Sequence, residues 1–492
     1  MGNPCVHTPN VDRLCAEEAV SFRNAFCQAP VCVPSRCSFM TGWYPHVRGH
    51  RTMFHMLRQD EPTLLQRLKE EGYFVWWGGK NDLVPAQHGF EGHCDVKFQP
   101  TRPLQELPSG WRGDPDGDGF FSFYHGQLEP AADSGSGTGL YDHDWACVLG
   151  AIDQLRQLPE DQPFCLYLPL LNPHPPFAVE EPFYSAIDRG CVPPRIPTPA
   201  DWEGKPSMLR GIYEQSRMQS WSEDRWTELR ATYYAMCERT DHQFGLILQA
   251  LRDVGVWDDT AVFFFSDHAS YVGDYGIVGI NQNTFDDVLT HVPFVCKPPA
   301  GVTVVPGTRD ALIELIDFTA TVEELAGLPP THTHFGRSLL PLLAGGPDAL
   351  RDAVFAEGGR RQDETHCKEL EYPPGHQDPQ DLYFPRLSLQ AGDGPEHTRA
   401  FMCRTRTHKY VRRLYESDEL YDLQTDPQEL HNVIDDPTYA ACLATLRERL
   451  LQWFVETADV VPFDPDQRGN VADESVQSDL GSDIDRRWDN HR

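Results

Sequence analysis

Two hydrophobic patterns alternate along the chain. Three continuously apolar runs predict strands buried on both faces, at residues 73–77, 164–171 and 260–265. Helical periodicity begins after Thr8 and Pro9, and it returns at residues 61–71 and about 222–253, which Gly72 and Gly255 end. Alternating helices and apolar strands predict an α/β fold.

Polar residues follow each of the three strands. The sequences are "GGKND", "NPHPP" and "SDHAS", which place Lys80, His174, Asp267 and His268 just beyond strand ends. Because ligands of open α/β sheets gather beyond the carboxyl ends of the strands, we predict one shared polar site. The alternative is that these are ordinary polar loops, since most strands end in one.

The pattern changes after residue 343. The segment "RAFMCRTRTHKYVRRL" predicts two short strands joined by a turn, and residues 438–455 predict an amphipathic helix. We therefore predict a catalytic domain over residues 1–350, a smaller C-terminal α+β subdomain over 351–463, and an acidic, disordered tail over 464–492.

A Gly-, Asp- and Ser-rich stretch within the first domain predicts a surface insertion, at residues 109–142. Inside it, "DPDGDG" resembles half of a calcium loop. The bidentate glutamate that such a loop needs is replaced by His125, so we do not predict calcium binding there.

Composition narrows the classes of partner. The formal net charge of the 492 residues is −32, which argues against nucleic acid and anionic membranes as partners. An anionic substrate would need a locally positive pocket.

The chain has neither a long apolar run nor a signal sequence at its start, which predicts a cytoplasmic protein. Its fourteen cysteines form no CxxC pair, so we expect reduced thiols.

The segment "VCVPSRCSFMTG" at residues 31–42 carries the most distinctive chemistry. Pro34 suits the first turn of a helix that begins near Cys32 and ends at Gly42. A helix N-terminus favours an anion, and Arg36 adds donors shaped for an oxyanion. Cys32 could then be a nucleophile, a metal ligand, half of a disulfide or a buried thiol, although the cysteine spacing matches no common zinc motif.

This segment resembles the sulfatase signature, in which Cys-x-Pro-x-Arg directs oxidation of the cysteine to formylglycine. Other segments resemble sulfatases in the same order, among them "TPNVDRL", "GWYPHVRGH", "GVWDDTAVFFFSDH" and "ELYDLQTDPQELHNV". The resemblance implies an alkaline phosphatase-like α/β fold with a large mixed sheet flanked by helices. It also implies hydrolysis of sulfate esters.

The resemblance further implies roles for four residues in catalysis. Cys32 would be converted by a formylglycine-generating enzyme, and the hydrated aldehyde would attack the ester sulfur. Arg36 would hold the hydrate, Lys80 would bind the sulfate, and His174 would lie near the sulfate and the leaving group.

The resemblance implies a divalent cation as well, most plausibly Ca²⁺ and otherwise Mg²⁺ or Mn²⁺, with Asp267 and His268 as two of its ligands. The sequence departs from the family in three ways. It begins after the strand that supplies the family's other metal ligands, which would leave neighbouring strands with unpaired edges. Asp82 replaces a histidine that contacts formylglycine, where it could hold a proton beside the substrate, bind the cation or point away. Ile280 takes the place of a second sulfate-binding lysine.

Three hypotheses follow for function. The first is a sulfatase that cleaves a small aryl or sugar sulfate. The second is an impaired sulfatase-fold protein that binds an anion without turnover, and the third is a phosphodiester or phosphonate ester hydrolase. The sequence identifies neither the ester nor the oligomeric state.

Overall fold

The computed structural model describes residues 2–105, 124–128, 140–370, 377–379, 381, 383–463 and 465. Most of the predicted insertion, including "DPDGDG", and nearly all of the predicted tail lie outside these residues. The helices are α1 (Pro9–Glu17), α2 (Cys32–Thr41), α3 (Pro45–Arg48), α4 (Leu64–Glu70), α5 (His143–Leu155), α6 (Phe183–Ala186), α7 (Ser207–Ser216), α8 (Glu223–Asp253), α9 (Asp287–Thr290), α10 (Asp317–Ala326), α11 (Leu340–Leu343), α12 (Phe384–Ala391) and α13 (Ala440–Thr457).

The strands are β1 (Val20–Phe26), β2 (Phe74–Trp77), β3 (Val96–Lys97), β4 (Tyr124–Leu128), β5 (Phe164–Tyr167), β6 (Phe177–Glu180), β7 (Val262–Phe265), β8 (Tyr271–Val272), β9 (Val278–Gly279), β10 (His291–Val292), β11 (Phe294–Lys297), β12 (Gly307–Glu314), β13 (Val354–Gly358), β14 (Ala400–Arg404), β15 (His408–Arg413) and β16 (Glu419–Asp422).

The largest sheet is mixed. β1 pairs with β12 in parallel along one edge, and with β10 and β11 in antiparallel orientation along the other. β7 then pairs with β11, from Phe294 opposite Phe265 to Lys297 opposite Val262. A second sheet is parallel throughout and runs in the order β3, β2, β5.

A cavity of about 760 Å³ separates the two sheets between β5 and β7. Residues 163–174 and 259–270 line it along both strands, together with side chains of α8 and α10. In the described chain, β5 pairs only with β2 and β7 only with β11, so the facing edges carry no ladder.

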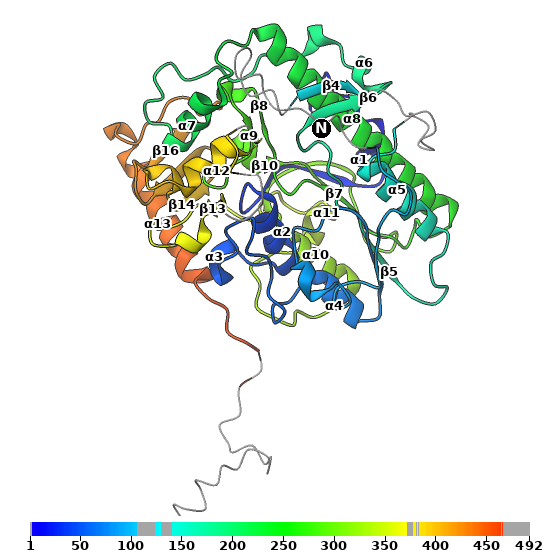
Figure 1. Ribbon diagram of the computed structural model, residues 1–492. Coiled ribbons are helices and arrows are strands. Elements are labelled where there is room, and N and C mark those ends of the chain that lie inside the picture. The colour runs from blue at the N-terminus through cyan, green and yellow to red at the C-terminus, as the bar shows by residue number, and fades with distance from the viewer. Residues whose placement is uncertain are drawn as a thin grey trace, which may run out of the picture.

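Helices cover both faces of these sheets (Figure 1). Strand β2 shows why both faces are covered. Successive side chains of a strand point to opposite faces, as do those of Val75, Trp76 and Trp77. Trp76 packs in a core with residues of α1, α5 and α8, whereas Val75 and Trp77 pack in a core with residues of α2, α4 and α10. The result is a three-layered α/β/α arrangement, which confirms the predicted α/β class.

The C-terminal part forms an antiparallel sheet in the order β13, β14, β15, β16. One face packs against α13 through Tyr410, Leu446 and Trp453, and the other face packs against the large sheet around Phe26 and Leu312. The two strands and the helix predicted from the sequence are confirmed. The domain boundaries remain a prediction.

Several predicted elements are shorter in the structure, and two of them have a clear local cause. The helix predicted from residue 61 begins at Leu64, because the Thr63 hydroxyl caps it by accepting the Gln66 N–H at 2.9 Å. The strand predicted over 164–171 ends at Tyr167, because Pro169 has no N–H to continue a ladder.

The expectation of reduced thiols throughout is wrong for one pair. Cys5 and Cys191 form a disulfide that joins the N-terminal segment to the loop after α6, while the other twelve cysteines are free. These two cysteines lie 186 residues apart, so no local spacing of cysteines could have predicted the pair.

In the described part of the chain, no helix combines the length and the hydropathy that crossing a membrane requires.

Candidate active site

Cys32 is the first residue of α2, as predicted. The helix is buried along its whole length, and Gly42 ends it in the left-handed conformation with φ of 71°. A Cβ at Gly42 would lie 2.7 Å from the Cβ of His334, so only glycine fits there. The N-terminus of this buried helix directs its positive dipole end toward Cys32.

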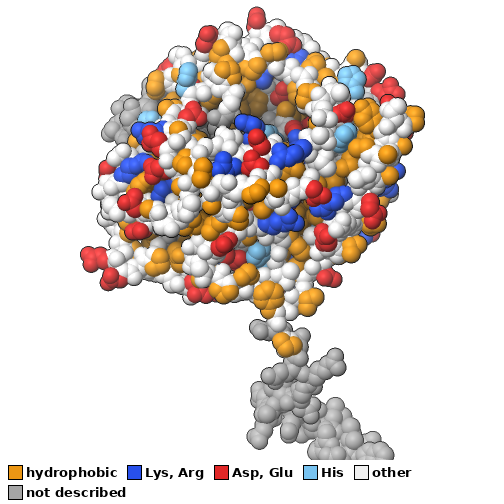
Figure 2. Space-filling view, turned by 180° about the vertical axis from the view of Figure 1, so that it is seen from behind, with side chains coloured by type: hydrophobic (Ala, Val, Ile, Leu, Met, Phe, Trp, Pro, Cys, Tyr) orange, Lys and Arg blue, Asp and Glu red, His pale blue; other side chains and the backbone are white. Residues whose placement is uncertain are grey.

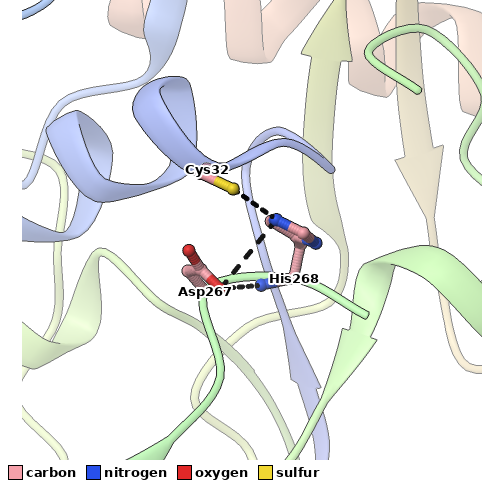
Figure 3. Close-up of side chains that lie close together, drawn as sticks. All are labelled: Cys32, Asp267 and His268. Carbon is pink, nitrogen blue, oxygen red and sulfur yellow. Dashed lines mark hydrogen bonds and ion pairs between the residues drawn. The ribbon is translucent and has the colours of Figure 1, made fainter. Parts of the chain in front are cut away.

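Two basic groups contact the Cys32 sulfur. Its Sγ lies 3.1 Å from Nε2 of His268 and 3.1 Å from Nζ of Lys80. Figure 3 shows the thiol at the start of α2 pointing toward the His268 ring, with Asp267 beside the same ring. Cys32 is only 1% exposed. The polar residues that follow β2 and β7 therefore meet at the start of α2.

Arg36, one helical turn after Cys32, fixes Asp267. Its Nε donates to Oδ2 of Asp267 at 2.8 Å, and its Nη1 lies 3.5 Å from the Tyr167 hydroxyl. The hydroxyl of Ser35 donates to the Asp267 carbonyl at 2.5 Å. These contacts tie α2 to the ends of β5 and β7. The signature arginine thus contacts a carboxylate.

Asp82 lies beside Lys80. Its Oδ2 is 2.7 Å from the Lys80 Nζ, and the Asp82 backbone has a positive φ of 44°. Lys80 therefore shares its charge between Cys32 and Asp82. The described contacts pair Asp82 with the lysine, a partner that the sequence did not indicate.

His174 lines the same cavity as Cys32, Lys80 and Asp267. Its Nδ1 lies 2.6 Å from the carbonyl of Pro175. A buried carboxylate holds the preceding loop, because Asp144 of α5 accepts the N–H groups of Leu171 at 2.7 Å and Asn172 at 2.8 Å. Sequence reasoning missed Asp144, although a carboxylate in the first turn of an otherwise apolar helix was a signal.

Burial and neighbouring charges set the protonation states. Burial raises the pKa of Cys32, but Lys80 and His268 outweigh it, and the pKa ends well below its usual value. A side-chain hydrogen bond with His174 acts in the same direction. Burial lowers the pKa of His268, yet Asp267 and Cys32 raise it to about 9. The charges of Lys80 and His268 thus favour the ionised form of Cys32.

Two further residues bear on the anion pocket. Ile280 is buried and packs in the same apolar cluster as Cys32. Tyr383, which precedes α12, was missed by sequence reasoning. Burial raises its pKa to about 12, and Lys80 and Cys32 are among the charges that act on it. The C-terminal part of the chain thus reaches the site.

The described residues do not fit calcium. Asp267 and His268 offer one ring nitrogen and one carboxylate oxygen that Arg36 does not hold, and this oxygen already accepts the His268 N–H at 3.1 Å. Calcium takes six to eight oxygen ligands. We therefore derive no catalytic step through a hard cation.

A nucleophilic side chain at a helix N-terminus, flanked by Lys80, Arg36 and two histidines, suits transfer of an anionic group from an ester. Fold and site define an alkaline phosphatase-like hydrolase.

The comparisons identify the family. The family model described as Sulfatase matches residues 1–328, more than half of the chain, and a model described as "N-sulphoglucosamine sulphohydrolase, C-terminal" matches residues 393–456. The chain therefore belongs to the sulfatase family and is a sulfuric ester hydrolase.

The similar proteins span nearly the whole chain. The "Multifunctional alkaline phosphatase superfamily protein PehA" of Trinickia caryophylli is 26% identical over 93% of this chain and 91% of its own length. The choline-sulfatase of Rhizobium meliloti is 24% identical over 96% and 87%. The crystal structure of the phosphonate monoester hydrolase of Agrobacterium radiobacter superimposes with a TM-score of 0.71 at 24% identity, covering 94% of this chain and 96% of that one, which shows the shared fold.

Proposed function

We propose that the protein cleaves a small sulfate monoester, of an aromatic alcohol or a sugar, with residue 32 as the nucleophile after its cysteine has been oxidised to formylglycine. One observation carries the proposal. The side chain of residue 32 lies within 3.1 Å of both Lys80 Nζ and His268 Nε2, at a buried helix N-terminus inside the sulfatase signature.

Formylglycine, once formed, supplies a hydrated aldehyde with one hydroxyl for attack and another for release of sulfate. The other residues of the site bind and orient the sulfate ester. Lys80 binds a sulfate oxygen, and the N–H groups at the start of α2 donate to another. His174 faces the same cavity, where it donates a proton to the departing alcohol oxygen.

The charge balance favours a singly charged ester. Lys80 contacts Asp82 at 2.7 Å, so its positive charge is partly neutralised before substrate enters. A sulfate monoester carries one negative charge, whereas a phosphate monoester carries nearly two at neutral pH. Phosphonate monoesters and phosphodiesters also carry one charge, and the similarity to PehA and to a phosphonate monoester hydrolase makes them the second candidate class.

The test begins with the mass of the tryptic peptide that contains residue 32, from protein produced in its native host. Formylglycine lowers the mass by about 18 Da relative to the thiol. The modified protein should then hydrolyse p-nitrophenyl sulfate faster than the corresponding phosphonate ester. Cys32→Ala should abolish hydrolysis, while Cys442→Ser, a change on α13, should leave it intact.

Two outcomes would refute this assignment. An unmodified Cys32 in the native host, with sulfate binding but no turnover, would support the anion-binding alternative. Full activity of the Cys32→Ala variant would exclude residue 32 as the nucleophile.

A further inference from the structure

Asp82 is a carboxylate beside a site that binds anions, where a negative charge is unfavourable. Its Oδ2 lies 2.7 Å from Nζ of Lys80, the same group that contacts Cys32 Sγ at 3.1 Å. We propose that Asp82 makes the site select esters with one negative charge over esters with two. The inference deepens the proposed function and rests on it for the chemical class of the ligand.

The contacts of Asp82 do not explain it as a support of the fold. Among the described residues, its one partner is Lys80, and the buried Oδ2 accepts no hydrogen bond. The adjacent Asn81 shapes the loop instead, because its Oδ1 accepts the N–H of Val84 at 3.2 Å and its Nδ2 donates to the carbonyl of the same residue at 2.7 Å. The carboxylate of Asp82 therefore acts mainly through its charge.

That charge reaches both cations next to residue 32. Burial lowers the pKa of Lys80, but Cys32 and Asp82 raise it above its ordinary value, so the lysine stays charged. Burial also lowers the pKa of Arg36, while acidic groups raise it, Asp267 first and Asp82 among the others. The side chains of Lys80 and Asp82 are 18% and 19% exposed, so salt and water screen their charges little.

Coulomb's law turns this arrangement into selectivity. The repulsion between Asp82 and a bound anion is proportional to the charge of the anion, so a dianion is repelled twice as strongly as a monoanion. A sulfate monoester carries one negative charge at every pH of interest, whereas a phosphate monoester carries nearly two at neutral pH. Asp82 therefore weakens the binding of phosphate monoesters more than that of sulfate monoesters.

The experiment measures binding without turnover, in the full chain with Cys32→Ala, which removes the nucleophile. Calorimetry at pH 8 gives Kd for phenyl sulfate, for phenyl phosphate and for methyl phenyl phosphate, a diester with a single charge. We expect phenyl sulfate and the diester to bind roughly ten-fold or more tightly than phenyl phosphate. Agreement between sulfate and diester separates the effect of charge from the exchange of sulfur for phosphorus.

Substitutions of Asp82 in the same protein give the decisive readout. Asparagine suits the left-handed backbone at this position, where φ is 44°. Asp82→Asn should strengthen binding of phenyl sulfate roughly five-fold and of phenyl phosphate roughly 25-fold, because doubling the ligand charge doubles the gain on a logarithmic scale. Asp82→Glu keeps the charge and should keep the preference. Asp153→Asn, whose side chain is 69% exposed on α5, should change neither Kd.

Equal gains for both esters in Asp82→Asn would overturn the proposal, because a carboxylate that merely restrains Lys80 affects every anion alike. A preference that survives Asp82→Asn unchanged would also overturn it. Failure of the proposed function is a separate result. In that case protein with formylglycine at residue 32 would not hydrolyse phenyl sulfate, while the charge preference measured in the Cys32→Ala protein would still support the role of Asp82.

Discussion

The charge of Lys80 can be tested directly by mutation. Lys80 lies 3.1 Å from the sulfur of Cys32 and 2.7 Å from Asp82, in a chain with only seven lysines. Lys80→Ala removes a preorganised donor from the anion site, so kcat/KM for an aryl sulfate should fall roughly 100- to 1,000-fold. The measurement is steady-state hydrolysis by protein with formylglycine at residue 32.

A second lysine provides the control. Lys69 pairs with Asp95 at 3.0 Å, outside the Cys32 site, so Lys69→Ala should change kcat/KM by less than roughly two-fold. A small effect of Lys80→Ala would show that the sulfate is held elsewhere, with the N-terminus of α2 as the remaining candidate.

The sequence predicted single residues well where they follow a strong local pattern. Cys32, Lys80 and Asp267 each stand beside a helix start or a strand end, and the structure brings them together. Tyr383 could not be found this way, because it is some 350 residues from Cys32 along the chain and belongs to no motif. Asp82 was found, but its pairing with Lys80 depends on backbone dihedrals that residue order does not specify.

At the scale of elements, the N-terminus of α5 supports the loop that carries His174. Asp144 accepts the N–H groups of Leu171 and Asn172, and it is 1% exposed. In Asp144→Asn, one of these N–H groups would face an amide donor, so we expect a loss of roughly 1–3 kcal/mol in unfolding free energy. A displaced His174 should lower kcat by roughly 10- to 100-fold.

Chemical denaturation and steady-state kinetics measure these two effects separately. Asp153→Asn, on the exposed face of the same helix, should alter neither. If Asp144→Asn loses stability but keeps its kcat at a temperature where it is fully folded, the carboxylate has a purely structural role and His174 tolerates the movement.

Elements were predicted better than their pairing. Apolar runs located β2, β5 and β7 because a strand covered on both faces must be apolar throughout. Which strands pair is a non-local property, so the separation of β5 from β7 by a 760 Å³ cavity is seen only in the structure. The Cys5–Cys191 disulfide was missed for the same reason.

For the whole molecule, net charge opposes the local field of the site. The chain carries −32, yet Arg36, Lys80 and His268 surround the residue 32 side chain. Figure 2 shows one face on which Lys and Arg side chains gather beside a hollow, so the charge is unevenly distributed. An anionic substrate is therefore repelled at long range and attracted at short range.

Salt separates these two contributions, because the Debye length falls from about 30 Å at 0.01 M to about 8 Å at 0.15 M. Over that range the long-range repulsion is screened, while contacts with Lys80 at hydrogen-bond distance are screened much less. We expect kcat/KM for p-nitrophenyl sulfate to rise roughly two- to five-fold. An aryl sulfate with an added carboxylate should show a steeper rise, because it carries a second charge through the same field. A fall in kcat/KM with salt would mean instead that the basic groups around the cavity steer the substrate from a distance, and that the acidic surface lies too far from the entrance to matter.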